Sequence, residues 1–257
     1  MKVASKKEVT KVEENKAPAV YDYGDHAGAG FENTGREDYQ VPMLYVTQAL
    51  SPLVQEKKVE AGMLVNNVTG EVFDEIVLVP CLTQHVFVEW VPREKGGGFV
   101  GVHSIDSPEV AQAKASSKEF GDYWLPNGNQ LVETFYVYCV TPAMEQVILP
   151  ISSSKIKKYR GWMTRARSIL VPLRDGRRIN PPLYAHRYRL SITQEKGQQG
   201  IYYNIDVAFD GKDAADARLA PDSDLFVAAS NFKRLASEGS VKVANPDKGA
   251  DTDETAF

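Results

Sequence analysis

Cysteine is scarce in this sequence: the 257 residues include only Cys81 and Cys139, each inside an apolar run. Two distant cysteines provide neither a disulfide framework nor a CxxC metal or redox motif. No apolar run approaches the roughly 18 residues of a membrane-spanning helix, and the first residues contain no apolar signal segment. We therefore expect a protein of a reducing, intracellular compartment that is neither secreted nor inserted in a membrane.

Motifs of catalysis are also missing. The four histidines, at positions 26, 85, 103 and 186, form neither HExxH nor HxxxH, and no GxSxG, GxGxxG or GxxxxGK[ST] motif occurs. The sequence thus predicts a protein that is not an enzyme and that uses no metal and no cofactor. One enzymatic alternative stays open, a nuclease that holds Mg²⁺ on carboxylates. The candidate ligands are Glu71, Asp74 and Glu75, or Asp206 and Asp210.

The composition divides the chain into three parts. Hydrophobic residues make up 43% of it, which is enough for a folded core. Residues 1–38 are polar, charged and glycine-bearing, and residues 237–257 are small and acidic, so neither segment offsets the entropy lost on ordering. We expect a flexible N-terminal arm at 1–38, a folded core at 39–236 and a flexible acidic C-terminal tail at 237–257.

Strand patterns dominate the core. Alternating or β-branched runs predict strands at 75–90, 130–141, 183–193 and 201–209, the last two joined as an antiparallel hairpin. The run at 75–90 is long enough for one bent strand or for two. Three helices are predicted, each beginning after a serine: one from Pro108, one over 155–170 and one after Ser223. This order indicates a mainly β protein, a β-rich α+β fold built as an antiparallel barrel or sandwich with added helices.

Charge is distributed unevenly along the chain. Between Lys155 and Arg189 there are eleven lysines and arginines and one carboxylate, Asp175, a net charge of +10. The whole chain carries −4, so the remainder carries −14. Such segregation of charge favours a binding site for a polyanion. The alternative is a solvated helix face whose cations form ion pairs with carboxylates elsewhere in the chain. The cations expected to contact phosphates are Lys157, Lys158, Arg160, Arg165, Arg187 and Arg189.

Aromatic residues accompany these cations. Exposed rings beside a cationic groove suit stacking with single-stranded bases, although in a β protein each ring can equally belong to the core. The candidates for stacking are Trp90, Tyr136, Tyr138 and Tyr202. The segment WVPREKGGGFVGVH at 90–103 predicts a hairpin that closes over a strand with Arg93 and Lys95, or else a plain turn.

The C-terminus combines acidic residues with a terminal aromatic ring. Asp251, Asp253 and Glu254 precede Phe257. Such an end can place its ring in a partner's pocket while its acids meet basic residues, and the alternative is a merely solubilising tail.

An acidic tail that ends in phenylalanine, behind a β-rich core with basic and aromatic residues, resembles phage and bacterial single-stranded DNA-binding proteins, including the gene 2.5 type of T7-like phages. The runs GREDYQVPMLYVTQALSP, WVPREKGGGFVG and SSSKIKKYRGW are also similar to phage replication proteins of that role. The resemblance implies an OB-fold, a Greek-key barrel here elaborated with helices, and binding of single strands without sequence preference. It further implies that the tail residues recruit a polymerase, a primase or helicase, or a recombinase.

We therefore expect a non-catalytic protein that coats and protects single-stranded DNA in phage replication or recombination. We expect it to act in the cytoplasm of the bacterial host and not to bind membranes. A homo-oligomer is compatible with this function. Two other functions stay open: a metal-dependent nuclease or accessory of a nucleic-acid enzyme, and a phage assembly protein whose cationic segment contacts another protein.

Overall fold

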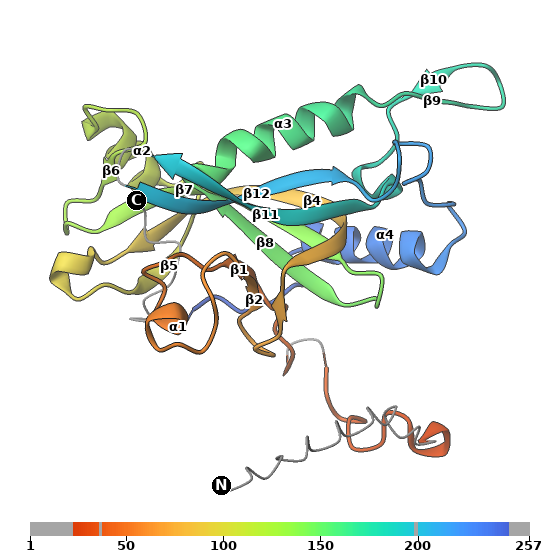
Figure 1. The fold of residues 1–257 in the computed structure, drawn as a ribbon, viewed down its shortest axis with the longest axis horizontal. Coiled ribbons are helices and arrows are strands. Elements are labelled where there is room, and N and C mark those ends of the chain that lie inside the picture. The colour runs from red at the N-terminus through yellow and green to blue at the C-terminus, as the bar shows by residue number, and fades with distance from the viewer. Residues whose placement is uncertain (1–22, 36–37, 198–199, 247–257) are drawn as a thin grey trace, which may run out of the picture. The chain divides into compact units, whose positions relative to one another are not determined.

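The computed structural model describes residues 23–35, 38–197 and 200–246 (Figure 1). The chain divides into two units, residues 1–35 and 36–257. The described part of the first unit is exposed and contains one short 3-10 helix, η1 (Gly24–His26). All elements that follow belong to the second unit.

Seven strands form one antiparallel sheet, so the expectation of a mainly β fold is confirmed. The strands are β4 (Glu75–Trp90), β5 (Phe99–Ser104), β6 (Tyr123–Trp124), β7 (Gln130–Val140), β8 (Gln146–Ser152), β11 (Tyr188–Gly197) and β12 (Gly200–Phe209). Two small sheets accompany it. They consist of β1 (Leu44–Val46), β2 (Leu64–Asn66) and β3 (Val72–Phe73), and of β9 (Val171–Pro172) and β10 (Arg178–Ile179).

The run at 75–90 is one long strand, β4, with an irregularity in its middle. Its pairing with β7 shifts between Pro80 and Leu82, because proline has no N–H to donate to a ladder. On its other side β4 pairs with β11 through its first residues and with β5 through its last. The order of the large sheet is β12-β11-β4-β7-β6, and β8 also pairs with β7, so β12-β11-β4-β7-β8 is a second continuous path. Helix α3 (Lys155–Ser168) lies between β8 and β11 in sequence.

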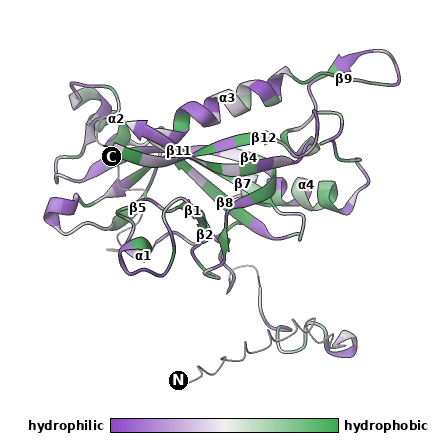
Figure 2. Cartoon of the chain, in the orientation of Figure 1, coloured by the Kyte–Doolittle hydropathy of each residue, from purple (hydrophilic) through white to green (hydrophobic). Residues whose placement is uncertain are grey.

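The central strands are covered on both faces. One face packs against Ile156, Tyr159 and Trp162 of α3, and the other packs against Phe232 of helix α4 (Asp224–Ser237). Both cysteines are buried and free in this core. Figure 2 colours the strands beneath these helices largely as hydrophobic, while α3 shows hydrophilic residues along its length.

The predicted helices occur where the serine signals placed them. Ser107 Oγ accepts a hydrogen bond from the Val110 N–H at the start of α2 (Pro108–Ser116), and Ser223 Oγ accepts one from the Phe226 N–H at the start of α4. Ser154 precedes α3 but makes no side-chain capping bond. Short helices complete the described chain: α1 (Pro52–Gln55), η3 (Arg93–Lys95) and η4 (Leu183–Ala185).

The predicted hairpin is β11 with β12, paired from Tyr188 with Phe209 to Gly197 with Gly200. Residues 183–185 form η4 and not the start of the strand. Side chains form hydrogen bonds with the backbone along the outer edge of β12. The Gln48 amide donates to the carbonyl of Tyr203 (2.8 Å) and accepts from its N–H (2.9 Å), and Asn204 Oδ1 accepts from the Ile205 N–H. Arg165 donates to the Val207 carbonyl.

The end of the described chain packs on the core. Val243 forms an isolated parallel β-bridge with Val41, and Ala244 is buried. Asn245 accepts a hydrogen bond from the Tyr136 hydroxyl. The core therefore continues beyond the boundary expected at residue 236. No helix in the described segments has the length and apolar character needed to cross a membrane.

Candidate nucleic-acid interface

Helix α3 presents two different sides. Ile156, Tyr159, Trp162 and Ala166 are spaced by three or four residues and are buried, which fixes the helix on the sheet. The remaining positions carry lysines and arginines, most of them exposed. The hydrophobic stripe thus dictates which cations point outward.

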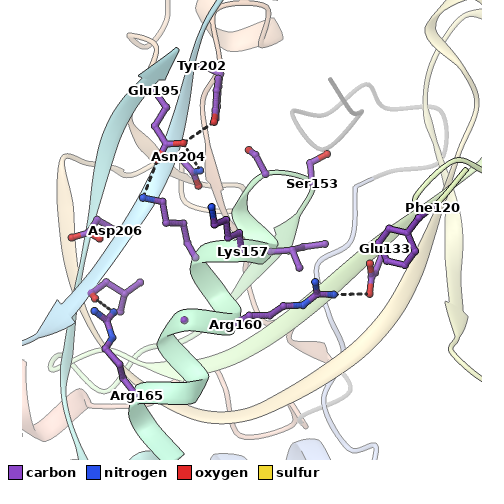
Figure 3. Close-up of a pocket in the computed structure, with 15 residues that line it drawn as sticks. Phe120, Glu133, Ser153, Lys157, Arg160, Arg165, Glu195, Tyr202, Asn204 and Asp206 are labelled. Atoms are coloured by element: carbon purple, nitrogen blue, oxygen red, sulfur yellow. Dashed lines mark hydrogen bonds and ion pairs between the residues drawn. The ribbon is translucent and has the colours of Figure 1, made fainter. Parts of the chain in front are cut away.

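A groove of about 850 Å³ lies between α3 and β12 (Figure 3). Lys157, Lys158, Arg160 and Arg165 enter it from the helix, and Tyr202 and Asn204 enter from β12. It also contains three carboxylates, from Glu133, Glu195 and Asp206. The structure therefore brings five of the predicted site residues together, four cations and Tyr202.

Most of these cations are engaged within the protein. Lys158 Nζ lies 2.9 Å from Glu195 Oε1, and Arg160 Nη2 lies 3.7 Å from Glu133 Oε1. Arg165 donates to the Val207 carbonyl. Lys157 is exposed and makes no ion pair or side-chain hydrogen bond to the described residues. The ion-pair alternative is thus realised in part, and a polyanion would have to exchange with these partners.

Glu195 is the centre of a small polar network in the groove. Besides Lys158, its carboxylate accepts hydrogen bonds from the Tyr202 hydroxyl (2.6 Å) and from Asn204 Nδ2 (3.1 Å). These donors lower the pKa of Glu195 to about 2, with the Tyr202 hydroxyl contributing most. The same hydrogen bond raises the pKa of Tyr202. Glu195 therefore holds Lys158 and Tyr202 together at neutral pH.

A second groove, of about 570 Å³, adjoins the first. The two share Phe120, Glu133, Ser153 and Ile156. Phe120 is 84% exposed, and Trp124, which lines the second groove only, is 41% exposed. The exposed Phe120 ring, at the junction of the two grooves, is suited to stacking with bases.

The sequence analysis did not select Phe120. It lies in the polar connection that follows α2, next to Gly121, whose φ of 90° turns the chain. A single aromatic residue within the polar run SSKEFGD is the signal that points to it. In the fold its ring meets Tyr123 of β6 edge-on, with 6.3 Å between the ring centroids.

Three predicted stacking residues are wrong. Trp90, Tyr136 and Tyr138 are only 1%, 3% and 5% exposed, and all three belong to the core cluster on the α4 side. The Tyr138 ring packs edge-on against Phe232, and its hydroxyl donates to Gln84. Bases cannot reach the faces of buried rings, so these residues are part of the folded core and not of the interface.

The segment at 90–103 forms the predicted hairpin, β4 with β5. Gly96, Gly97 and Gly98 all have positive φ, which explains the run of glycines at its turn. Arg93 lines the second groove. The Lys95 ammonium group donates to the Gly128 carbonyl at 3.3 Å, so this cation ties the hairpin to the loop before β7.

Arg187 and Arg189 lie outside both grooves. Arg187 pairs with Asp210 at 3.2 Å, and Arg189 pairs with Asp210 at 2.7 Å and with Glu75. These carboxylates raise the pKa of Arg189. The two arginines therefore join β11 to β4 and to the end of β12.

Two further expectations concern carboxylates. The described residues contain no group of three or more His, Cys, Asp or Glu side chains placed to hold a metal ion, and both Glu75 and Asp210 are occupied by Arg189. The tail residues Asp251, Asp253, Glu254 and Phe257 lie outside the described residues.

The fold and the grooves define a mainly β protein with helices on both faces of its sheet and a cationic helix beside an exposed aromatic ring. Residues 8–242 match the family described as Pam3 phage gp34-like protein. The chain belongs to this family and is a phage protein. No curated protein and no solved structure matches it.

Proposed function

We propose that this phage protein binds single-stranded DNA without catalysis, along α3 and past Phe120. The observation that carries the proposal is the charge segregation: eleven cations against one carboxylate between Lys155 and Arg189, in a chain whose remainder carries −14. Helix α3 exposes part of this charge beside the first groove. Phosphates would meet the cations while bases stack on the exposed ring.

The strand order supports the same proposal. The path β12-β11-β4-β7-β8, with α3 between β8 and β11, resembles the order of a five-stranded OB-fold. OB-folds bind oligonucleotides at their second and third strands and at the connections after the first and fourth strands. The corresponding connections here are residues 91–129, which contain Phe120, and the β11–β12 turn, which Glu195 and Tyr202 flank.

The phage family and the residue types of the tail support a proposal for the biological role. We propose that the protein coats single strands during phage replication or recombination in the host cytoplasm. Asp251, Asp253, Glu254 and Phe257 would recruit a polymerase, primase, helicase or recombinase. The ring and the charges of such a tail suit a pocket with a basic rim.

The test is a salt titration of binding to a labelled single strand and to a duplex of the same sequence. Single-strand affinity should fall linearly on a log–log plot, and Lys157→Ala should reduce the slope by about 0.7. Lys233→Ala removes the same charge from α4, on the opposite face of the sheet, and should leave the slope unchanged. Equal effects of both variants, or equal affinity for the duplex, would contradict the proposal.

Phe120→Leu tests the ring. Because Phe120 is 84% exposed, the variant should fold normally, and loss of stacking should cost about 1–3 kcal/mol of binding free energy. Cleavage of the strand after Mg²⁺ is added would instead favour the nuclease alternative.

A further inference from the structure

The β9–β10 hairpin is the feature that the proposed interface does not use. Residues 170–180, called the arm below, leave the end of α3, turn, and return to η4. Figure 1 shows the arm projecting away from the large sheet. Its pairing is short, Val171 with Ile179 and Pro172 with Arg178, and a turn closes it through the bond from the Leu173 N–H to the Arg177 carbonyl (2.7 Å).

The arm is fixed to α3 by one side chain. The Asn180 amide donates to the carbonyls of Ala166 (3.1 Å), Arg167 (3.1 Å) and Ile169 (2.9 Å), which are among the unpaired carbonyls at the end of the helix. A hairpin with so few strand bonds of its own is marginal in isolation. The Asn180 bonds therefore fix the base of the arm to the end of α3.

The surface of the arm combines two chemistries. Arg174, Arg177 and Arg178 are exposed, and its one carboxylate, Asp175, is held by Arg177 at 2.7 Å. Beside them Leu170, Leu173 and Ile179 are 47%, 36% and 40% exposed. Arginines alone would be sufficient to bind a phosphate backbone. Proteins that insert side chains between base steps in a DNA groove combine arginines with neighbouring aliphatic groups.

We propose that the arm binds duplex DNA that adjoins the single strand held along α3. The inference rests on the proposed function and adds to it a preferred ligand, the junction between single strand and duplex. The arginines contact phosphates on the two sides of a groove, and Leu173 at the turn contacts the base edges. Paired strands can enter a groove of a duplex, and the phosphates of the duplex complement the charge of the exposed arginines.

The experiment compares three labelled probes of equal length: a single strand, a blunt duplex, and a single strand with a duplex end. The full-length protein should bind the junction on the order of tenfold more tightly than the single strand at about 100 mM salt. The double variant R174A/R178A should lose this preference and keep its single-strand affinity within about twofold. The double variant K233A/R234A removes the same charge from α4 and should keep the preference.

A second variant, Leu173→Ala, distinguishes contacts with the base edges in the groove from contacts with the phosphate backbone. It should weaken junction binding without changing its salt slope, because the slope counts phosphates. Equal affinity for junction and single strand, or a preference that survives R174A/R178A, would overturn the inference and leave the proposed function intact. Failure to bind the single strand would overturn the proposed function itself. If R174A/R178A lost binding to another protein while its junction affinity stayed unchanged, the arm would be a surface for binding protein. The proposal that the arm binds duplex DNA would then be refuted.

Discussion

Replacing Glu195 by glutamine should strengthen binding to single-stranded DNA. Glu195 Oε1 holds Lys158 Nζ at 2.9 Å within the first groove, so this lysine is not available to a phosphate until the pair opens. Glutamine keeps an acceptor for the Tyr202 hydroxyl and removes the charge. Lys158 is then released toward the strand.

The size of the effect follows from counterion release. One additional phosphate contact on a single strand adds about 0.7 to the magnitude of the log–log salt slope, which corresponds to roughly eightfold tighter binding near 50 mM salt. The gain should shrink as salt increases. Both partners are partly exposed, so loss of the pair should reduce the free energy of unfolding by no more than about 1 kcal/mol.

The assay is fluorescence anisotropy with a labelled oligonucleotide over about 50 to 500 mM salt. Glu75→Gln is the matched control, because it removes one charge and weakens the hold on Arg189, which lies outside both grooves. Equal gains in the two variants would mean that only the net charge matters. An unchanged slope in Glu195→Gln would refute the reasoning that Lys158 reaches a phosphate.

Two further predictions concern stability. The pKa of Glu195 is about 2 in the fold and ordinarily 4.5. The ionised carboxylate therefore stabilises the folded state fully above pH 4.5, and this contribution is lost as the pH falls toward 2. The difference in melting temperature between wild type and Glu195→Gln should narrow over that range. Gln48→Ala leaves the N–H and carbonyl of Tyr203 without their partner and should lower the free energy of urea unfolding by about 2–4 kcal/mol, whereas Gln55→Ala, at an exposed amide, should change it by less than about 0.5 kcal/mol. A loss for Gln48→Ala no larger than that of Gln55→Ala would show that the edge of β12 does not need this side chain.

Local signals predicted much of the fold. Serine followed by proline placed the start of α2, Ser223 placed the start of α4, and the spacing of Ile156 and Tyr159 identified the buried side of α3. Strand alternation predicted the β11–β12 hairpin and located residues 75–90 in the sheet, but it left open whether they form one bent strand or two; they form the single strand β4. Each of these features depends on contacts between residues that are near in sequence, or on a hydrophobic period that one segment carries by itself.

The error at Tyr136 and Tyr138 has a different origin. Both faces of residues 135–140 are apolar or aromatic, a pattern typical of a strand that is buried on both sides. The interpretation gave one face to the core and left the other open, because no local signal says that α4, about ninety residues later, returns to cover it. The ion pairs of Lys158, Arg187 and Arg189 were open only as a general alternative. Their partners could not be named, because Glu195, Asp210 and Glu75 lie far from them along the chain.

The double pairing of β4 has a consequence for synthesis of the chain. Residues 75–78 form their ladder with residues 188–191, which the ribosome adds about 110 residues later. At about 5 to 20 residues per second this separation corresponds to roughly 5 to 20 s. During that time residues 79–90 of β4 can pair with β7, and the last of them also with β5, while residues 75–78 expose an unpaired edge. The nascent protein thus passes through a stage in which most of its central strand is paired, while the first four residues of that strand need protection from neighbouring chains.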